Sequence, residues 1–130
     1  MGPGSEVPRL DPVHLEQDLG GPESLAGLRR WIRTHVVADA DALADAQLVA
    51  TELASNAIEH APGPRVVRLR VSATRFTVEV EDAAPDAALT LGVSRLGGNR
   101  GRGLQVVNVL GRWGVHRRPT RKTVWATISL

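Results

Sequence analysis

The chain has 130 residues, which is enough for one domain with a single core, and its 42% hydrophobic and 23% charged residues are typical of a globular protein. No apolar run reaches the roughly 18 residues of a membrane span, no secretory signal is recognisable and there are no cysteines, so we expect a cytoplasmic protein without membrane contact, disulfides or thiolate metal sites. The sequence pI of about 10.3 gives no argument for nucleic acid binding, because the formal net charge is only +2 and Lys122 is the single lysine, so almost nothing titrates below the arginine range.

The N-terminal part of the chain predicts a leader, a strand and a helix. Residues 1–9 are expected to form a flexible leader, in which Gly2-Pro3-Gly4-Ser5 resembles a cloning remnant, and residues 10–130 a single domain. Apolar and polar residues alternate from Val13 to Gln17, which predicts a first strand. Apolar residues then recur at helical spacing, so residues 23–37 are predicted to form an amphipathic helix.

The strongest helix prediction covers residues 41–60, where apolar side chains gather on one half of a helical wheel and polar ones on the other. Glu52, Asn56 and His60 lie four residues apart and therefore form one stripe at the border of the apolar half. Two interpretations are open at this point: the stripe is a solvated helix face, or it lines the edge of a pocket. Ala61-Pro62-Gly63-Pro64 ends the helix.

Two strands follow over residues 66–72 and 75–82, and a hairpin is expected to join them. Antiparallel pairing would set the arginines of the first strand opposite the glutamates of the second on a solvated face. Asp82 shares the apolar face of its strand, so we expect its carboxylate to be buried and to need a partner. The alternative is that Asp82 already belongs to the following turn and caps it.

The last part of the chain predicts a glycine-bearing lid, a helix and two closing strands. Residues 83–100 are small and polar without periodicity, which is typical of a functional lid or of disorder. Gly101-Arg102-Gly103-Leu104 begins a predicted helix, whose free N–H groups would attract phosphate. Strands are predicted over residues 113–117 and 122–130. The order of elements indicates an α+β fold: a two-layer α/β sandwich with helices on one face of a mostly antiparallel, mixed sheet.

Several segments of the chain resemble a known family. The run from Leu48 to Ala61, with the letters LVATELASNAIEHA, resembles the N box of bacterial anti-sigma-factor serine/threonine kinases, which belong to the histidine-kinase-like (GHKL) ATPases with the Bergerat fold. Other segments follow in the family's order and are similar to its adenine-aspartate strand, its second glycine box and its closing strands: Thr77 to Asp82, Gly101 to Leu104, and Trp113-Gly114 with Lys122 to Ala126. The resemblance favours the functional interpretation of the polar stripe.

The resemblance implies ATP and Mg²⁺ as cofactors and assigns roles to single residues. Asn56 would ligate Mg²⁺ through its amide oxygen, Asp82 would accept a hydrogen bond from the adenine amino group, and Glu52 would act as general base on a serine hydroxyl. The second glycine box would bind the nucleotide phosphates with Gly101, Arg102, Gly103 and Leu104. His60 receives no chemical step and is expected to pack or to orient its neighbours.

Two positions depart from the family's pattern. Ala84 and Asp86 stand two and four residues after the aspartate, where the first glycine box often carries glycines. Thr123 resembles the threonine that supports the adenine aspartate, so it is a candidate nucleotide-binding residue. Strand alternation, however, places Thr123 with Trp125 and Thr127. Either this strand points Trp125 inward or Thr123 misses the site.

The resemblance implies an anti-sigma factor with kinase activity. Such a protein phosphorylates an anti-sigma-factor antagonist and holds a sigma factor inactive when the antagonist is absent; related kinases often pair, which leaves a homodimer open. The altered first glycine box motivates the alternative of a non-catalytic, nucleotide-responsive binding module of the same fold. Direct nucleic acid binding is disfavoured, because acidic residues nearly balance basic ones and only Phe76 and three tryptophans could stack on bases.

Overall fold

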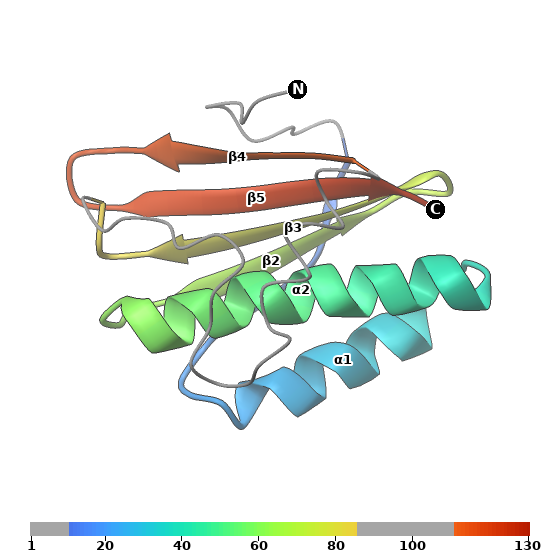
Figure 1. The fold of residues 1–130 in the computed structure, drawn as a ribbon, viewed down its shortest axis with the longest axis horizontal. Coiled ribbons are helices and arrows are strands. Elements are labelled where there is room, and N and C mark those ends of the chain that lie inside the picture. Colours follow the sequence, from blue (N-terminus) through green and yellow to red (C-terminus); the bar gives the residue numbers. More distant parts are fainter. Residues whose placement is uncertain (1–10, 86–110) are drawn as a thin grey trace.

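Two helices cover one face of a five-stranded sheet in the computed structural model, which describes residues 11–85 and 111–130 (Figure 1). The strands lie in the order β1-β2-β3-β5-β4, and every pairing between these described strands is antiparallel. The two layers confirm the predicted α+β sandwich. The leader and the helix predicted from Gly101 lie outside the described residues.

The helices follow the predictions to within two residues. Helix α1 spans Ser24–His35 and helix α2 spans Ala40–His60. Asp39 caps α2, because its side chain accepts a hydrogen bond from the backbone N–H of Ala42 at 2.8 Å. Neither helix is long and apolar enough to cross a membrane, a finding that covers the described residues only.

The strands also lie close to their predicted positions: β1 Val13–Asp18, β2 Val66–Val71, β3 Arg75–Asp82, β4 Gly111–Arg117 and β5 Lys122–Ser129. The predicted hairpin joins β2 to β3 and is closed by a hydrogen bond from the Ser72 N–H to the Arg75 carbonyl at 2.8 Å. In the strand order β1-β2-β3-β5-β4, both β3 and β5 lie in the interior of the sheet, and alternate residues of each strand face the helices.

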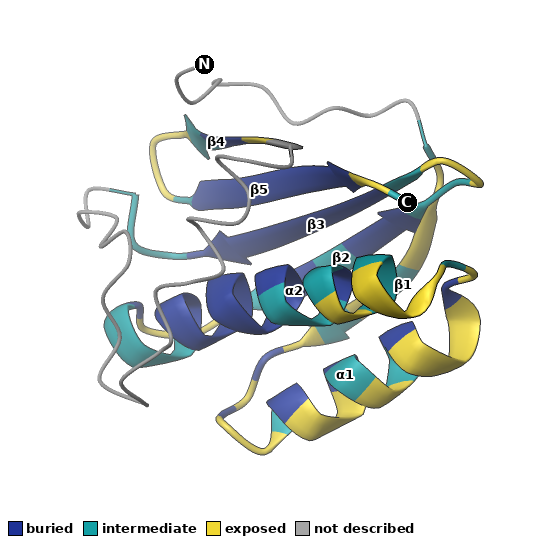
Figure 2. Cartoon of the chain, turned by 45° about the vertical axis from the view of Figure 1, so that its right-hand side comes forward, coloured by how far each residue is buried: buried dark blue, intermediate teal, exposed yellow. Residues whose placement is uncertain are grey.

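The hydrophobic core lies between the sheet and the helices. Helix α2 packs against β3 and β5 and also against α1, and Figure 2 shows it buried along much of its length. The buried apolar residues come from both layers and include Leu28, Ile32, Leu53, Leu69, Phe76, Val78, Val80 and Ala126. The burial of α2 extends to polar side chains, since Thr51, Glu52, Ser55 and Asn56 are buried along with its apolar residues.

The opposite face of the sheet carries charged pairs, but it is not solvated as predicted. Glu79 is 0% exposed and forms an ion pair with buried Arg70, while Arg68 contacts Glu81 at 3.0 Å. The predicted pairing of arginines with glutamates is thus confirmed, and the prediction that this face is solvated is wrong. In the register of the sheet, Trp125 of β5 lies directly opposite Glu79 and is itself 3% exposed, so a large buried side chain stands next to the charged residues.

Glu81 makes the folded state sensitive to acid. Burial by itself raises the pKa of Glu81, but the hydrogen bonds and charges of Arg68 and Arg121 outweigh that effect and hold the pKa below its ordinary value of 4.5. The unfolded chain lacks these arginine contacts, so it takes up the proton at a higher pH than the folded chain does. The stabilisation is therefore complete well above pH 4.5 and is lost as the pH falls below that value toward the folded-state pKa.

We expect Glu81→Gln to lower the free energy of unfolding at pH 7 and to lose less of it than the wild type between pH 6 and about pH 3. Urea titrations at a series of pH values measure both quantities. Asp18→Asn is the control, because Asp18 is an exposed carboxylate with no ion pair among the described residues. Equal acid sensitivity of Glu81→Gln and the wild type would contradict the assignment.

Candidate functional site

The polar stripe on α2 is buried. Glu52 is 2% and Asn56 is 6% exposed, and the neighbouring Thr51 and Ser55 are buried as well. The interpretation as a solvated helix face is therefore wrong. These residues lie in the second half of α2, where every residue from Val49 to Ala57 is buried.

Asn56 has a side-chain amide without a hydrogen-bond partner in the part of the chain that the structure describes. The same holds for the Thr51 hydroxyl and for Nε2 of His60. Buried polar groups in proteins are nearly always hydrogen-bonded, and leaving one unsatisfied costs about 1–3 kcal/mol. An amide oxygen is also a ligand that Mg²⁺ accepts. Asn56 therefore fits a position whose partner is a bound ligand or ion.

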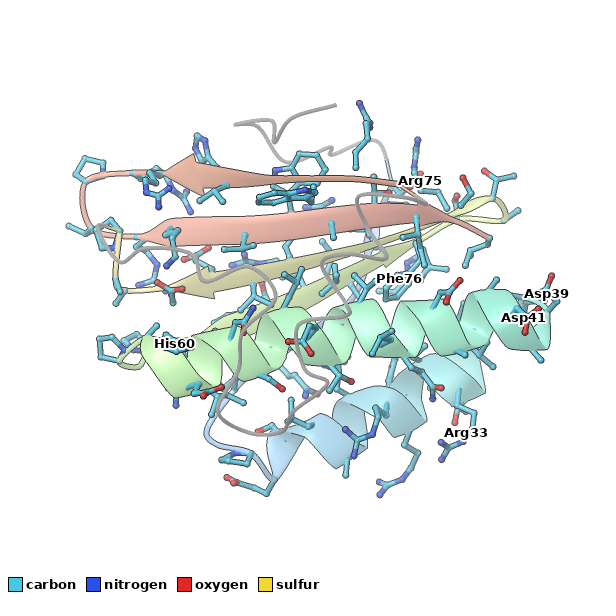
Figure 3. All side chains as sticks on the ribbon, viewed as in Figure 1. Arg33, Asp39, Asp41, His60, Arg75 and Phe76 are labelled. Atoms are coloured by element: carbon cyan, nitrogen blue, oxygen red, sulfur yellow. The ribbon has the colours of Figure 1, made fainter. Side chains whose placement is uncertain are left out.

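The end of α2 is held in place by Arg65. Its Nη1 donates to the carbonyl oxygens of Ile58 at 3.2 Å and Ala61 at 2.7 Å, and its Nε donates to that of Leu19 at 3.1 Å. A cation is favourable there because the last carbonyls of a helix carry partial negative charge. His60 is the last residue of this helix, as Figure 3 shows. Arg65 thus fixes the helix end next to the buried polar stripe.

Asp82 ends β3 on the face that the helices cover. It is 2% exposed and shares this face with Val80, as the alternation predicts. Its Oδ1 accepts a hydrogen bond from the backbone N–H of Ala84 at 2.8 Å. Both interpretations of Asp82 are therefore correct: the carboxylate is buried, and it also caps the following turn.

Lys122 faces Asp82, a position that the sequence analysis did not predict. The two residues lie opposite one another in the antiparallel pair of β3 and β5, with Lys122 Nζ at 3.6 Å from Asp82 Oδ2. Lys122 is only 4% exposed. The signal was available, because alternation along the last strand places Lys122 on the same face as Val124 and Ala126.

Thr123 does not join this site. It lies opposite Glu81 in the sheet, on the face away from the helices, and its hydroxyl accepts a hydrogen bond from Arg118 at 3.4 Å. Trp125 lies on the same outer face, opposite Glu79. Of the two alternatives, the structure has the one in which Thr123 misses the site, because neighbouring residues of a strand point to opposite faces.

The later part of α2, the end of β3 and the start of β5 lie at one end of the sandwich (Figure 1). In Figure 3 His60 lies at this end, and Arg75 and Phe76 lie toward the opposite end of the sandwich. The second glycine box, with Gly101, Arg102, Gly103 and Leu104, lies outside the described residues. Within residues 11–85 and 111–130 no three acidic, histidine or cysteine side chains gather as a metal site. Among the described residues the ion would therefore rest on Asn56 and not on an acidic cluster, which suits Mg²⁺ held mainly by phosphate and water.

A comparison with protein families agrees with this arrangement. Residues 21–128 match the family described as the histidine kinase-like ATPase domain, and the matched segment contains both helices and the sites of Asn56 and Asp82. No curated protein matches the chain. The chain belongs to the family of histidine kinase-like ATPase domains, and it is therefore an ATP-binding domain of this type.

Proposed function

We propose that the chain is an ATP-dependent serine/threonine kinase that phosphorylates an anti-sigma-factor antagonist and sequesters a sigma factor when that antagonist is absent. One observation carries the nucleotide-binding part: Asn56 presents a buried, unpartnered amide one helical turn from Glu52, at the end of the sandwich that also holds Asp82. The likeness of residues 48–61 to the N box of anti-sigma-factor kinases supports the choice of substrate.

The binding roles follow from the donors and acceptors of each side chain. The Asn56 amide oxygen would ligate Mg²⁺, and its amide nitrogen would remain able to donate to a phosphate oxygen. Asp82 would accept from the amino group of adenine with a lone pair not used by the Ala84 N–H. Bound Mg²⁺ would neutralise charge on the transferred phosphoryl group. Burial of both side chains strengthens these contacts, because water does not compete for them.

Glu52 would serve as the general base in the transfer. As the hydroxyl oxygen of the substrate serine bonds to the γ-phosphorus, the bond to the β–γ bridging oxygen breaks and ADP leaves with that electron pair. The hydroxyl proton passes to the Glu52 carboxylate, which is 2% exposed. Phosphoserine, ADP and a protonated glutamate are the balanced products, and the glutamate then loses its proton to solvent.

Incubation with γ-labelled ATP, Mg²⁺ and antagonists encoded near this chain tests the proposal. We expect label on one serine or threonine of one antagonist, and none on the variant of that antagonist with alanine at the labelled position. Binding of a sigma factor should fall when the unphosphorylated antagonist is added. Failure to label any antagonist, although ATP binds, would contradict the kinase assignment.

A non-catalytic binding module is the second candidate, and the surroundings of Asp82 favour it. Ala84 replaces a glycine of the usual first glycine box, and its N–H already occupies Oδ1 of Asp82. In such a module nucleotide would only set the conformation of a partner-binding surface. Calorimetry measures the affinity for ATP and ADP, and the labelling experiment measures transfer. Affinity for nucleotide without any transfer would favour the module.

A further inference from the structure

Lys122 is a largely buried cation for which the described residues supply an ion pair but no hydrogen bond within the usual distance. Its side chain is 6% exposed, and Asp82 at 3.6 Å is its single polar partner among the described residues. That separation exceeds the 2.7–3.2 Å of an N–H···O hydrogen bond. Lys122 is also the only lysine in a chain whose other cationic side chains are arginines and histidines.

Such an ammonium group is unfavourable unless something accepts its hydrogen bonds. A lysine ammonium carries three N–H donors, and a buried charge is normally both paired and hydrogen-bonded. The ion pair with Asp82 supplies the opposite charge, but at 3.6 Å it supplies no hydrogen bond. An acceptor that enters beside Asp82 would complete the environment of Lys122.

We infer that Lys122 is a specificity-determining residue for the nucleotide base. It would donate a hydrogen bond to a ring nitrogen of adenine, next to the amino group from which Asp82 accepts a hydrogen bond. This inference rests on the proposed binding of ATP. Two ring nitrogens, N1 and N7, flank the amino group of adenine, and both are acceptors. Asp82 and Lys122 together present an acceptor and a donor side by side from paired strands, which matches an edge of the base that presents a donor beside an acceptor.

The alternative is that Lys122 only stabilises the fold by neutralising Asp82. A purely structural ion pair would be insensitive to the identity of the base, whereas a donor to a ring nitrogen senses the loss of that nitrogen. Analogues in which CH replaces one nitrogen, 1-deaza-ATP and 7-deaza-ATP, therefore separate the two roles without any change to the protein.

Calorimetry in the presence of Mg²⁺ would compare ATP and the two analogues on the wild-type chain and on Lys122→Met. We expect Lys122→Met to bind ATP roughly 10- to 100-fold more weakly, the usual effect of losing one hydrogen bond to a charged group. One of the two analogues should bind the wild type more weakly by a similar factor, and that difference should vanish in Lys122→Met. The affected analogue identifies the nitrogen.

Two further variants keep the outcome clear. Arg121→Met removes the neighbouring cation, which pairs with Glu81 on the outer face, and should leave all three affinities within a few-fold of the wild type. Lys122→Gln keeps an N–H donor without the charge and should retain part of the discrimination, which also covers the case that Lys122→Met fails to fold. Equal binding of ATP and both analogues to the wild type would overturn the inference while leaving the proposed function intact. No binding of ATP to the wild type would instead refute the proposed function.

Discussion

Glu52→Gln is expected to slow phosphotransfer about 10²- to 10⁴-fold while leaving the affinity for ATP within a few-fold of the wild type. Glutamine keeps the size and hydrogen-bonding shape of the side chain but cannot accept the serine proton. Because Glu52 is only 2% exposed, no bulk water replaces it as a base at that position. Single-turnover transfer from labelled ATP measures the rate, and calorimetry measures the affinity.

The control for this variant is Asp41→Asn, which neutralises an exposed carboxylate in the first turn of the same helix. It should leave both transfer and affinity unchanged. Sigma-factor binding should survive Glu52→Gln, because it depends on surface rather than on proton transfer. If Glu52→Gln abolished ATP binding as completely as the loss of a metal ligand does, the division of roles between Glu52 and Asn56 would be wrong.

Asn56→Ala is expected to abolish Mg²⁺-dependent binding of ATP, and phosphotransfer would be lost as a consequence. The change removes the amide oxygen that would ligate the metal, and alanine provides no other ligand. Titrations of ATP with Mg²⁺ and with a chelator give the metal-dependent part of the affinity.

The stability of the same variant distinguishes a ligand site from a structural one. The Asn56 amide has no hydrogen-bond partner among the described residues, so alanine removes an unsatisfied polar group instead of a made hydrogen bond. We therefore expect the ligand-free variant to lose less than about 1 kcal/mol in free energy of unfolding, or to gain stability.

Gln47→Ala provides the matched contrast on the same helix. Its side chain donates to the Arg29 carbonyl at 3.0 Å, so its loss should lower the stability without changing the affinity for ATP. A strongly destabilised Asn56→Ala that still binds ATP with Mg²⁺ like the wild type would contradict the site.

Much of the fold could be read from the sequence because local periodicity determines it. The helical spacing of Leu28 and Ile32 and the strand alternation of Phe76, Val78 and Val80 each record which side of an element is buried. The inward position of Asp82 followed from the same alternation. The position of Glu52 and Asn56 on one stripe of the helix followed from their spacing, and the family resemblance pointed to a functional role for that stripe. The roles of Gly101 to Leu104 remain predictions, since that segment lies outside the described residues.

Burial of the polar groups was decided by the tertiary structure. Periodicity tells which residues share a face, but it cannot tell what covers that face. Glu52 and Asn56 are buried in the folded chain, although the composition of their stripe is that of a solvated surface. On the outer face, Trp125 comes to lie against Glu79 by the register of two strands far apart in the chain.

The sequence by itself determined the elements of the described residues, the α+β class and the histidine kinase-like ATPase family, because these depend on short-range patterns and on an ordered set of motifs. Only the tertiary structure decided which residue meets Asp82. Alternation within β5 separates Lys122 and Thr123 onto opposite faces, but only the register of β3 against β5 sets Lys122, and not another inward residue of β5, opposite Asp82. That register is set by packing between segments forty residues apart, and no local pattern encodes it.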